Sequence, residues 1–306
     1  MRESRLKIPH FPQFEPFGLT CQSTISGFNN YLNSNYSDFV FTSLFTLDNN
    51  NSLKISNLNE NLVVVFDDSV SGETLLSILG KNCMDQSLNA LLEYAGTSLK
   101  INYLTFVPEL AIKALESPER FRVKLNRDNC DYLYKIAHQA DLLGADFANL
   151  RRKRNLCQRL YSPKFMKLSK TNFDDCWRLQ EEWRRSKVNL EKESILSLQR
   201  EADGLEKAFL FWDQLNLTMF GIAIDRQLKA FALLEEIPKK TLLIHHFKTA
   251  RGIKGLGEFF FWSLAQEFRS KLEFINFEQD LGSAGLRKFK KYLHPCCLLR
   301  KYVVGT

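Results

Sequence analysis

Acidic and basic side chains lie close together in the C-terminal part of the sequence, where a short apolar strand is predicted to end. Asn276, Glu278 and Asp280 alternate at this strand end, and a turn then leads into a helix that carries four cations. The cations are Arg287, Lys288, Lys290 and Lys291. The start of a helix offers unpaired N–H groups and a partial positive charge, so such a junction is a common ligand site. The carboxylates can hold an ammonium group or accept a proton, or they can instead cap the helix and pair with Arg287 or Lys290.

A second candidate site precedes an aromatic-rich predicted helix, in a turn that contains glycines and basic side chains. Gly255 and Gly257 let the backbone approach a phosphate group, and Arg251 and Lys254 can neutralise its charge. The same glycines can instead serve the turn and close packing of the chain. The pattern therefore predicts a phosphate-binding loop, with a structural role as the alternative.

Two consecutive histidines, His245 and His246, lie on a predicted strand and are expected to face opposite sides of the sheet. A neutral imidazole is available as a base near pH 7, and His246 is the candidate catalytic residue. The alternative is that one histidine is packed or hydrogen-bonded in the core and the other lies at an edge.

A basic run lies on a predicted helix and consists of Arg151, Arg152, Lys153 and Arg154. Successive residues project at steps of about 100°, so the charges wrap around the helix. The run is either a solvated surface or a contact for the phosphate backbone of a nucleic acid.

Charge is divided unevenly along the chain. Residues 1–150 carry 12 Lys and Arg against 17 Asp and Glu, whereas the remainder carries 30 against 18. The basic half is expected to attract polyanions such as tRNA or an anionic lipid surface.

Composition predicts a globular chain with packed cores. Its 306 residues, 44% of them apolar, give room for two domains. Because no apolar run reaches about eighteen residues and no signal peptide is apparent, we expect a cytoplasmic protein. Seven cysteines without a C-x-x-C pair argue against a metal site or a disulfide framework. In the vicinal pair Cys296 and Cys297, strand alternation predicts one side chain inside.

The order of the predicted elements favours an α/β fold of two domains, residues 1–150 and 151–306. Mixed, mostly antiparallel sheets are expected, flanked by helices. Four expectations concern single segments: a strand at 39–45, a helix at 71–80, a helical connector at 131–160 and one terminal strand at 297–304.

Four segments resemble the family that contains the catalytic region of phosphatidylglycerol lysyltransferases and its soluble bacterial relatives of uncharacterised function. They are residues 131–144, 151–155, 245–255 and 276–290. The last of these, NFEQDLGSAGLRKFK, is the most specific. This family has two tandem GNAT-like (acyl-CoA N-acyltransferase-like) domains. It is related to the Fem peptidoglycan aminoacyltransferases, which use aminoacyl-tRNA as donor.

The resemblance implies roles for the residues singled out above. Glu278 and Asp280 would orient the donor amino acid, with His246 as the third catalytic candidate. The basic run at 151–154 would contact tRNA. Substrate binding would fall to Asn276, Arg251, Lys254, Gly255, Gly257, Arg287, Lys288 and Lys290.

The chain departs from the family pattern in three places. Lys248 stands where the family carries Glu, and Phe277 stands where it usually carries a basic residue. Gly252 occupies the Gln or Arg position of the loop that binds coenzyme A in acyltransferases of this fold, so acetyl-CoA is less expected as a donor.

Three functions follow as hypotheses. The first is an aminoacyltransferase that uses aminoacyl-tRNA and an amine or hydroxyl acceptor, such as a lipid head group or a peptide, and needs no cofactor. The second is an acetyl-CoA-dependent N-acetyltransferase. The third is a non-catalytic RNA- or partner-binding protein with a decayed site.

Overall fold

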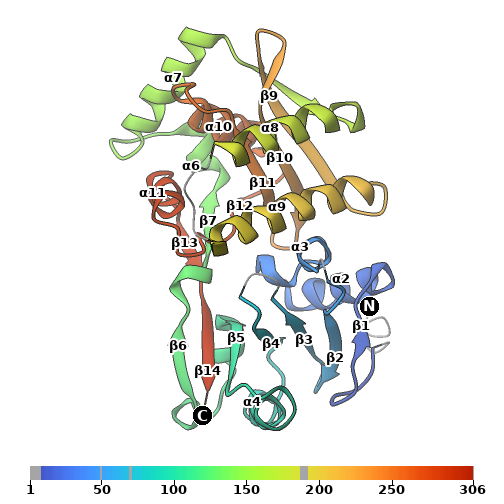
Figure 1. Cartoon of the computed structure of the whole chain (residues 1–306). Coiled ribbons are helices and arrows are strands. Elements are labelled where there is room, and N and C mark those ends of the chain that lie inside the picture. Colours follow the sequence, from blue (N-terminus) through green and yellow to red (C-terminus); the bar gives the residue numbers. More distant parts are fainter. Residues whose placement is uncertain (1–7, 49, 69–70, 187–191, 306) are drawn as a thin grey trace. The chain divides into compact units, whose positions relative to one another are not determined.

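The computed structural model describes residues 8–48, 50–68, 71–186 and 192–305 (Figure 1). The chain divides into two compact units. Unit 1 combines Met1–Asp131 with Leu299–Thr306, and unit 2 is the continuous segment Tyr132–Leu298. The predicted domains were 1–150 and 151–306, whereas the units divide at Asp131 and again before Leu299.

Unit 1 begins with an antiparallel four-stranded sheet in the order β1-β2-β3-β4. Its strands are β1 (Glu15–Pro16), β2 (Lys54–Leu58), β3 (Asn61–Asp67) and β4 (Thr74–Leu79). The helices of this part are α2 (Gln22–Leu32), α3 (Phe41–Leu47) and α4 (Met84–Tyr94). Buried side chains of β3, β4 and α4 form a common apolar core.

A second, three-stranded sheet of unit 1 has the order β5-β14-β6. Its strands are β5 (Tyr103–Pro108), β6 (Arg122–Leu125) and β14 (Lys301–Gly305), and the short helix α5 (Glu109–Ile112) follows β5. The central strand β14 is antiparallel to both neighbours although it lies at the far end of the sequence.

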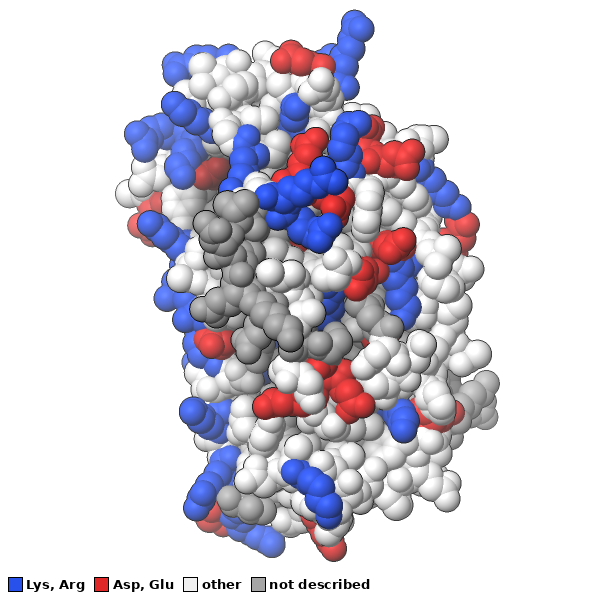
Figure 2. Space-filling view, in the orientation of Figure 1, with Lys and Arg blue, Asp and Glu red and all other residues white. Residues whose placement is uncertain are grey.

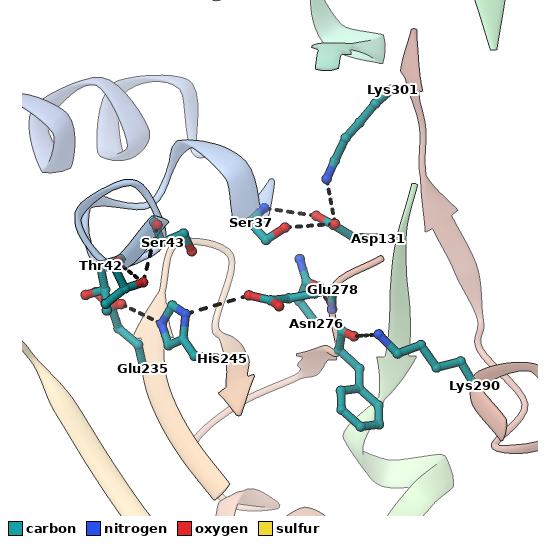
Figure 3. Close-up of polar contacts among 12 residues, drawn as sticks. Ser37, Thr42, Ser43, Asp131, Glu235, His245, Asn276, Glu278, Lys290 and Lys301 are labelled. Atoms are coloured by element: carbon teal, nitrogen blue, oxygen red, sulfur yellow. Dashed lines mark hydrogen bonds and ion pairs between the residues drawn. The ribbon is translucent and has the colours of Figure 1, made fainter. Parts of the chain in front are cut away.

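A buried polar cluster fixes β14 within unit 1 (Figure 3). Lys301 Nζ lies 2.6 Å from Asp131 Oδ1 and also pairs with Asp38, and the Lys301 side chain is fully buried. The second Asp131 oxygen accepts a hydrogen bond from Ser37 N at 2.9 Å. Buried charges are tolerated only when they are paired and hydrogen-bonded, so this cluster ties the two distant segments of unit 1 together.

Unit 2 is built on a seven-stranded sheet in the order β13-β7-β12-β11-β10-β9-β8. Neighbouring strands are antiparallel except for the parallel pair of β11 and β12. The strands are β7 (Asp131–Lys135), β8 (Lys164–Leu168), β9 (Leu217–Ile224), β10 (Gln227–Ile237), β11 (Thr241–Thr249), β12 (Phe274–Asn276) and β13 (Cys297–Leu299).

Helices accompany the sheet of unit 2 (Figure 1). They are α6 (Ile136–Asp141), α7 (Ala148–Tyr161), α8 (Phe173–Arg185), α9 (Lys192–Leu210), α10 (Leu256–Phe268) and α11 (Ala284–Tyr292). Helix α10 packs on α6, α7 and the sheet, and α8 packs on β10, β11 and α9. The aromatic run Phe259–Trp262 of α10 lies in or against the main core, as its sequence requires.

The units exchange strands along the chain. Strand β7 follows the strands of unit 1 in sequence but pairs with β12 of unit 2, whereas β14 follows unit 2 and completes the sheet of unit 1. Neither unit could have been delimited by a single cut in the sequence.

Four segments differ from their predicted structure. Within 39–45, residues 41–45 are helical and belong to α3, because the buried Phe41, Leu44 and Phe45 follow the i, i+3, i+4 spacing of a helix. Residues 71–80 contain strand β4, which pairs along its length with β3. The remaining differences are that 131–135 form β7 before the helices begin, and that 297–304 divide into β13 and β14, which belong to different sheets.

Within the described ranges, no helix combines the length and the apolar character needed to cross a lipid bilayer.

Candidate functional site

The two parallel strands of unit 2 separate at the candidate site. Strands β11 and β12 pair from Thr241 and Phe274 as far as Leu243 and Asn276. Strand β12 ends there, whereas β11 continues to Thr249. Because backbone pairing stops after Asn276, the next residues of both strands flank a fork in the sheet.

A β-bulge lies in β11 at this fork. Leu233 of β10 pairs with His246 and Leu234 pairs with Ile244, so His245 is an extra residue in β11. Leu233 and Glu235 share one face of β10, and His245 reaches Glu235 on that face. The side chains of both histidines therefore lie on the same face of the sheet. The prediction that they face opposite sides is wrong, because the bulge interrupts the regular alternation of side chains along β11.

His245 connects two carboxylates (Figure 3). Its Nε2 lies 2.9 Å from Glu235 Oε2, and its Nδ1 lies 3.7 Å from Glu278 Oε1. The imidazole is 6% exposed and Glu235 is 11% exposed, whereas Glu278 is 29% exposed. Glu278 is thus the member of the group that solvent or a substrate can reach most readily.

The two carboxylates keep His245 protonated. Burial lowers the pKa of an imidazole, but here the hydrogen bond and charge of Glu235 and the carboxylate of Glu278 outweigh it and raise the pKa of His245 to about 9. At neutral pH the imidazole of His245 is therefore positively charged. His245 therefore acts as a cationic donor that holds both carboxylates, rather than as a base.

The backbone fixes Glu278 in an unusual conformation. Its φ is +51°, in the left-handed region that a non-glycine residue seldom adopts. The fully buried Asn276 accepts a hydrogen bond from Glu278 N at 2.7 Å, and the Glu278 carbonyl accepts one from Tyr132 N at 3.0 Å. Strained residues of this kind gather at functional sites, where the surrounding contacts hold them.

Asp280 and Arg287 are paired with each other. Arg287 Nε and Nη2 donate to the two Asp280 oxygens at 3.0 and 2.7 Å. Tyr132 Oη and Gly282 N also donate to this fully buried carboxylate, at 2.6 and 3.0 Å. Burial opposes ionisation, but these donors together lower the pKa of Asp280 to about 2. These contacts match the alternative prediction for Asp280, in which its carboxylate pairs with a cation of the following helix.

Lys290 is also held inside the protein. Its ammonium group donates to the carbonyl oxygens of Phe277 and Gln279 and lies 4.7 Å from the centroid of the Phe277 ring. Phe277 itself belongs to an aromatic cluster with Phe247 and Phe261. Lys290 therefore supports the backbone on either side of Glu278, whereas Lys288 is exposed on the same helix.

His246 lies apart from this group, in a buried polar cluster beneath α8 and α9. Burial lowers the pKa of His246 to about 4, so the ring is neutral, and its Nδ1 has no hydrogen-bond partner among the described residues. Lys248 forms an ion pair with Glu201 at 2.7 Å and lies 3.4 Å from the centroid of the Trp183 ring. The charge of Lys248, which departs from the family pattern, is thus neutralised inside unit 2.

The glycine turn before α10 packs against α7. Gly255 has a φ of +78°, and a Cβ atom there would lie 2.1 Å from the Lys153 carbonyl oxygen. A Cβ at Gly257 would lie 3.3 Å from the Phe289 ring. Close packing is therefore what these glycines provide. Arg251 donates to the Ser186 carbonyl at 3.0 Å, whereas the exposed Lys254 remains beside the turn.

The basic run on α7 divides into two pairs. Arg151 donates to the carbonyl oxygens of Leu142 and Gly144, and Arg154 stacks over the Trp262 ring at 4.4 Å. Arg152 and Lys153 are exposed instead. Lys153, although exposed, pairs with Glu258 at 2.9 Å and lies 4.6 Å from the centroid of the Tyr292 ring.

A basic groove joins the two sequence-predicted cationic segments. It has a volume of about 910 Å³ and lies at the start of α10. We define the basic groove by its lining residues Arg152, Lys153, Asn155, Leu156, Arg159, Lys254, Gly255 and Glu258. Figure 2 shows Lys and Arg side chains gathered over the region of α7. The groove offers several cations and the N-terminus of a 13-residue helix, a combination that attracts anions.

Two residues of the site, Glu235 and His245, were not among the predicted site residues. Glu235 was part of an apolar strand, and His245 was named only as the neighbour of the candidate base His246. The hairpin of β10 and β11 could have indicated that Glu235 and His245 lie close together, because its three-residue turn places Glu235 opposite Leu243, two residues from His245. The bulge that brings His245 onto the same face as Glu235 cannot be recognised from the residue pattern.

Comparison with solved structures shows the fold. A conserved protein of unknown function from Bacteroides thetaiotaomicron has 23% identity and a TM-score of 0.84, over 95% of this chain and 98% of its own. L-PGS from Bacillus licheniformis has 14% identity and a TM-score of 0.61, over 98% and 93%. FemX has 9% identity and a TM-score of 0.57, over 95% and 96%. The chain has the tandem GNAT-like fold that its sequence predicted.

Comparison with protein families classifies the chain more narrowly than the fold does. The profile of the family described as phosphatidylglycerol lysyltransferase, C-terminal, matches residues 29–305, and this chain belongs to that family. The resemblance found in the sequence is thereby confirmed. A comparison with curated proteins gave no match. Family and fold are those of transferases that move acyl groups.

Proposed function

We propose that this protein transfers an aminoacyl group from aminoacyl-tRNA to an amine or hydroxyl acceptor, at the fork between β11 and β12. The observation that carries the proposal is the placement of Glu278. A partly exposed carboxylate is held at the fork by a protonated, buried His245, on a chain that belongs to the phosphatidylglycerol lysyltransferase family.

Glu278 orients the donor in this proposal. An aminoacyl ester carries an α-ammonium group near its reactive carbonyl, and a carboxylate binds that cation through charge-assisted hydrogen bonds. Glu235 and His245 are positioning residues, because Glu235 orients the imidazole and the imidazole orients Glu278. Asn276 fixes the Glu278 backbone from the other side.

The chemistry requires no cofactor. The acceptor nitrogen or oxygen forms a bond to the ester carbonyl carbon, and the bond from that carbon to the ribose oxygen breaks. The acceptor gives up one proton and the released ribose hydroxyl takes one, so the reaction is balanced without an oxidant or a metal. Because the ester is already activated, placement of the reactants supplies most of the acceleration, at best about 7 to 11 kcal/mol.

The basic groove supports a tRNA donor. Its exposed cations lie at the start of α10 and on α7, within the same unit as Glu278. Cations that neutralise phosphates bind nucleic acid without sequence preference and with strong salt dependence. In this proposal the groove contacts the tRNA backbone, while Arg151 and Arg154 keep α7 in place.

The first test examines whether the charge of the Glu278 side chain is needed for transfer. We expect Glu278→Gln to lower the transfer rate from labelled aminoacyl-tRNA by about 10- to 100-fold, since a hydrogen bond to a charged group contributes about 1.5 to 3 kcal/mol. Glu273→Gln is the matched control, because Glu273 is exposed and pairs with Lys240. Equal rates for wild type and Glu278→Gln would overturn the assignment.

The second test addresses the donor. Wild type should bind aminoacylated tRNA more tightly than uncharged tRNA, and the preference should disappear in Glu278→Gln. Arg159→Ala and Lys254→Ala should weaken binding of both forms and each reduce the salt slope by about one, whereas Lys164→Ala on the edge strand β8 should not. Heat released on titration with acetyl-CoA, without binding of tRNA, would favour an N-acetyltransferase.

A further inference from the structure

Two exposed thiols lie side by side in unit 2. Cys296 and Cys297 are both exposed, and their Sγ atoms are 3.9 Å apart. Strand alternation predicted one of them inside, and that prediction is wrong because Cys296 precedes β13, directly after a turn in which His294 has a φ of +55°. The chain therefore presents both sulfur atoms on one side.

The surroundings hold the pair in this arrangement. Cys296 N donates to the Leu133 carbonyl at 2.8 Å, and Cys296 Sγ approaches the same oxygen at 3.2 Å. Strand β13 is the edge of its sheet, so the thiols have protein on one side and solvent on the other. The neighbouring strand β7 pairs Leu133 with Asn276, which places the thiols two strands from the candidate site.

The separation of the sulfur atoms determines how far they must move to form each kind of bridge. A disulfide needs about 2.05 Å, so the sulfurs would have to approach to about half their present distance. Bonds from thiolates to a soft ion are about 2.3 Å long, so a linear two-coordinate ion would hold the sulfurs roughly 4.6 Å apart. A bent bridge through a single thiophilic atom holds the sulfurs closer together than a linear one, so it requires a smaller movement from 3.9 Å than a disulfide does.

We propose that Cys296 and Cys297 form a vicinal dithiol site for a bent, thiophilic trivalent centre, of which an organic arsenical is the representative. In the reaction with an arsenoxide, two As–S bonds form and the As=O bond breaks. The two thiol protons leave with the oxygen as water. No oxidant is consumed and arsenic remains trivalent, so the thiols and the arsenoxide are the only reactants.

The protonation of Cys296 is compatible with this chemistry. The hydrogen bond with Cys297, followed by burial, raises the pKa of Cys296 above its ordinary value. A protonated thiol reacts slowly with peroxide, because the thiolate is the nucleophile in oxidation. Condensation with an arsenoxide, in contrast, uses the thiol protons.

The experiment measures intact mass after treatment of the full chain with phenylarsine oxide. Wild type should gain one phenylarsenic group that survives excess monothiol and is removed by 2,3-dimercaptopropanol. Cys296→Ser and Cys297→Ser should lose the adduct in monothiol, because a single thiol cannot chelate. Cys83→Ser is the matched control, since Cys83 is exposed but lies in unit 1, and it should retain the adduct.

Three results would overturn the proposal. They are an adduct that monothiol strips from wild type, retention of the adduct by both Cys296→Ser and Cys297→Ser, and rapid loss of two hydrogen masses in dilute peroxide instead of chelation. Circular dichroism of the serine variants checks the fold, which should persist because a serine hydroxyl can replace the thiol near the Leu133 carbonyl. The mass measurement does not depend on the proposed transferase activity.

Discussion

His245 and His246 are chemically identical neighbours with opposite protonation states. Two carboxylates raise the pKa of His245 to about 9, whereas burial lowers the pKa of His246 to about 4 and outweighs the opposing charge of Glu201. The difference originates in which acidic side chains the bulge of β11 brings into reach. The sequence pattern placed Asn276 and Glu278 at the end of a strand, which is where the structure has them, but Glu235 was not singled out.

The protonation of His245 predicts a pH-dependent stability. Its folded pKa of about 9 lies above the unfolded value of about 6.5, so its contribution to the free energy of unfolding is complete below pH 6.5. This contribution, at most about 3 kcal/mol, should be lost as the pH rises through 9. Denaturant unfolding between pH 6.5 and 9.5 should show a decline in wild type that His245→Gln lacks.

His138→Gln is the control for this measurement, because His138 is exposed and its loss should leave the decline intact. A decline of the same size in His245→Gln would assign the effect to other groups.

At the scale of elements, the loop before α10 shows how one pattern can indicate two roles. The glycines and cations of residues 251–257 were predicted to bind phosphate, and the structure adds that Gly255 admits the Lys153 carbonyl of α7. Such a contact depends on two segments about a hundred residues apart, and a local pattern contains no information about it. The strand that carries the two histidines, β11, and the aromatic-rich helix α10 were predicted correctly, because buried apolar side chains dominate both sequences.

Two glycines of this loop provide a matched pair of substitutions. Gly255→Ala should destabilise unit 2 by more than about 2 kcal/mol, because the new Cβ would meet backbone 2.1 Å away in addition to the strain of a positive φ. Gly252→Ala should cost only about 1 kcal/mol, since its φ is +80° but no atom lies within 4 Å of the new Cβ. Thermal unfolding of the two variants measures the difference, and equal costs would contradict the contact with α7.

The docking of β14 depends on a buried charge. Lys301→Met should destabilise unit 1 by about 3 to 5 kcal/mol, because it leaves the fully buried Asp131 without its cation. Adding Asp131→Asn should recover part of this loss. The exposed Lys124 on β6 is the control, and Lys124→Met should change stability by less than about 0.5 kcal/mol. Hydrogen exchange of β5 and β6 amides measures each effect.

The whole molecule consists of one continuous unit that interrupts the sequence of the other. Sequence reasoning predicted two domains of the correct class, since helices and strands succeed one another in the order of the fold. It placed the boundary at residue 150, because β7 continues into helical residues and β14 directly follows β13. Strand exchange is a property of pairing between distant segments, which neither periodicity nor composition records.

This organisation predicts unit-specific effects of core substitutions. Val304 and Ile275 are both fully buried in strands, in unit 1 and unit 2 respectively. Val304→Asp should raise hydrogen exchange in β5 and β6 while leaving α10 protected, and Ile275→Asp should do the reverse. Loss of protection throughout the chain in both variants would indicate that the units unfold as one.

The central position of β14 also sets an order of events during synthesis on the ribosome. Residues 8–131 leave the ribosome first, but their three-stranded sheet lacks its middle strand until Lys301–Gly305 has been made. All of unit 2 is translated in that interval, and its own strands, including β7, are by then complete. The segment synthesised first is therefore the one that finishes folding last, and throughout that wait β5 and β6 have no strand between them.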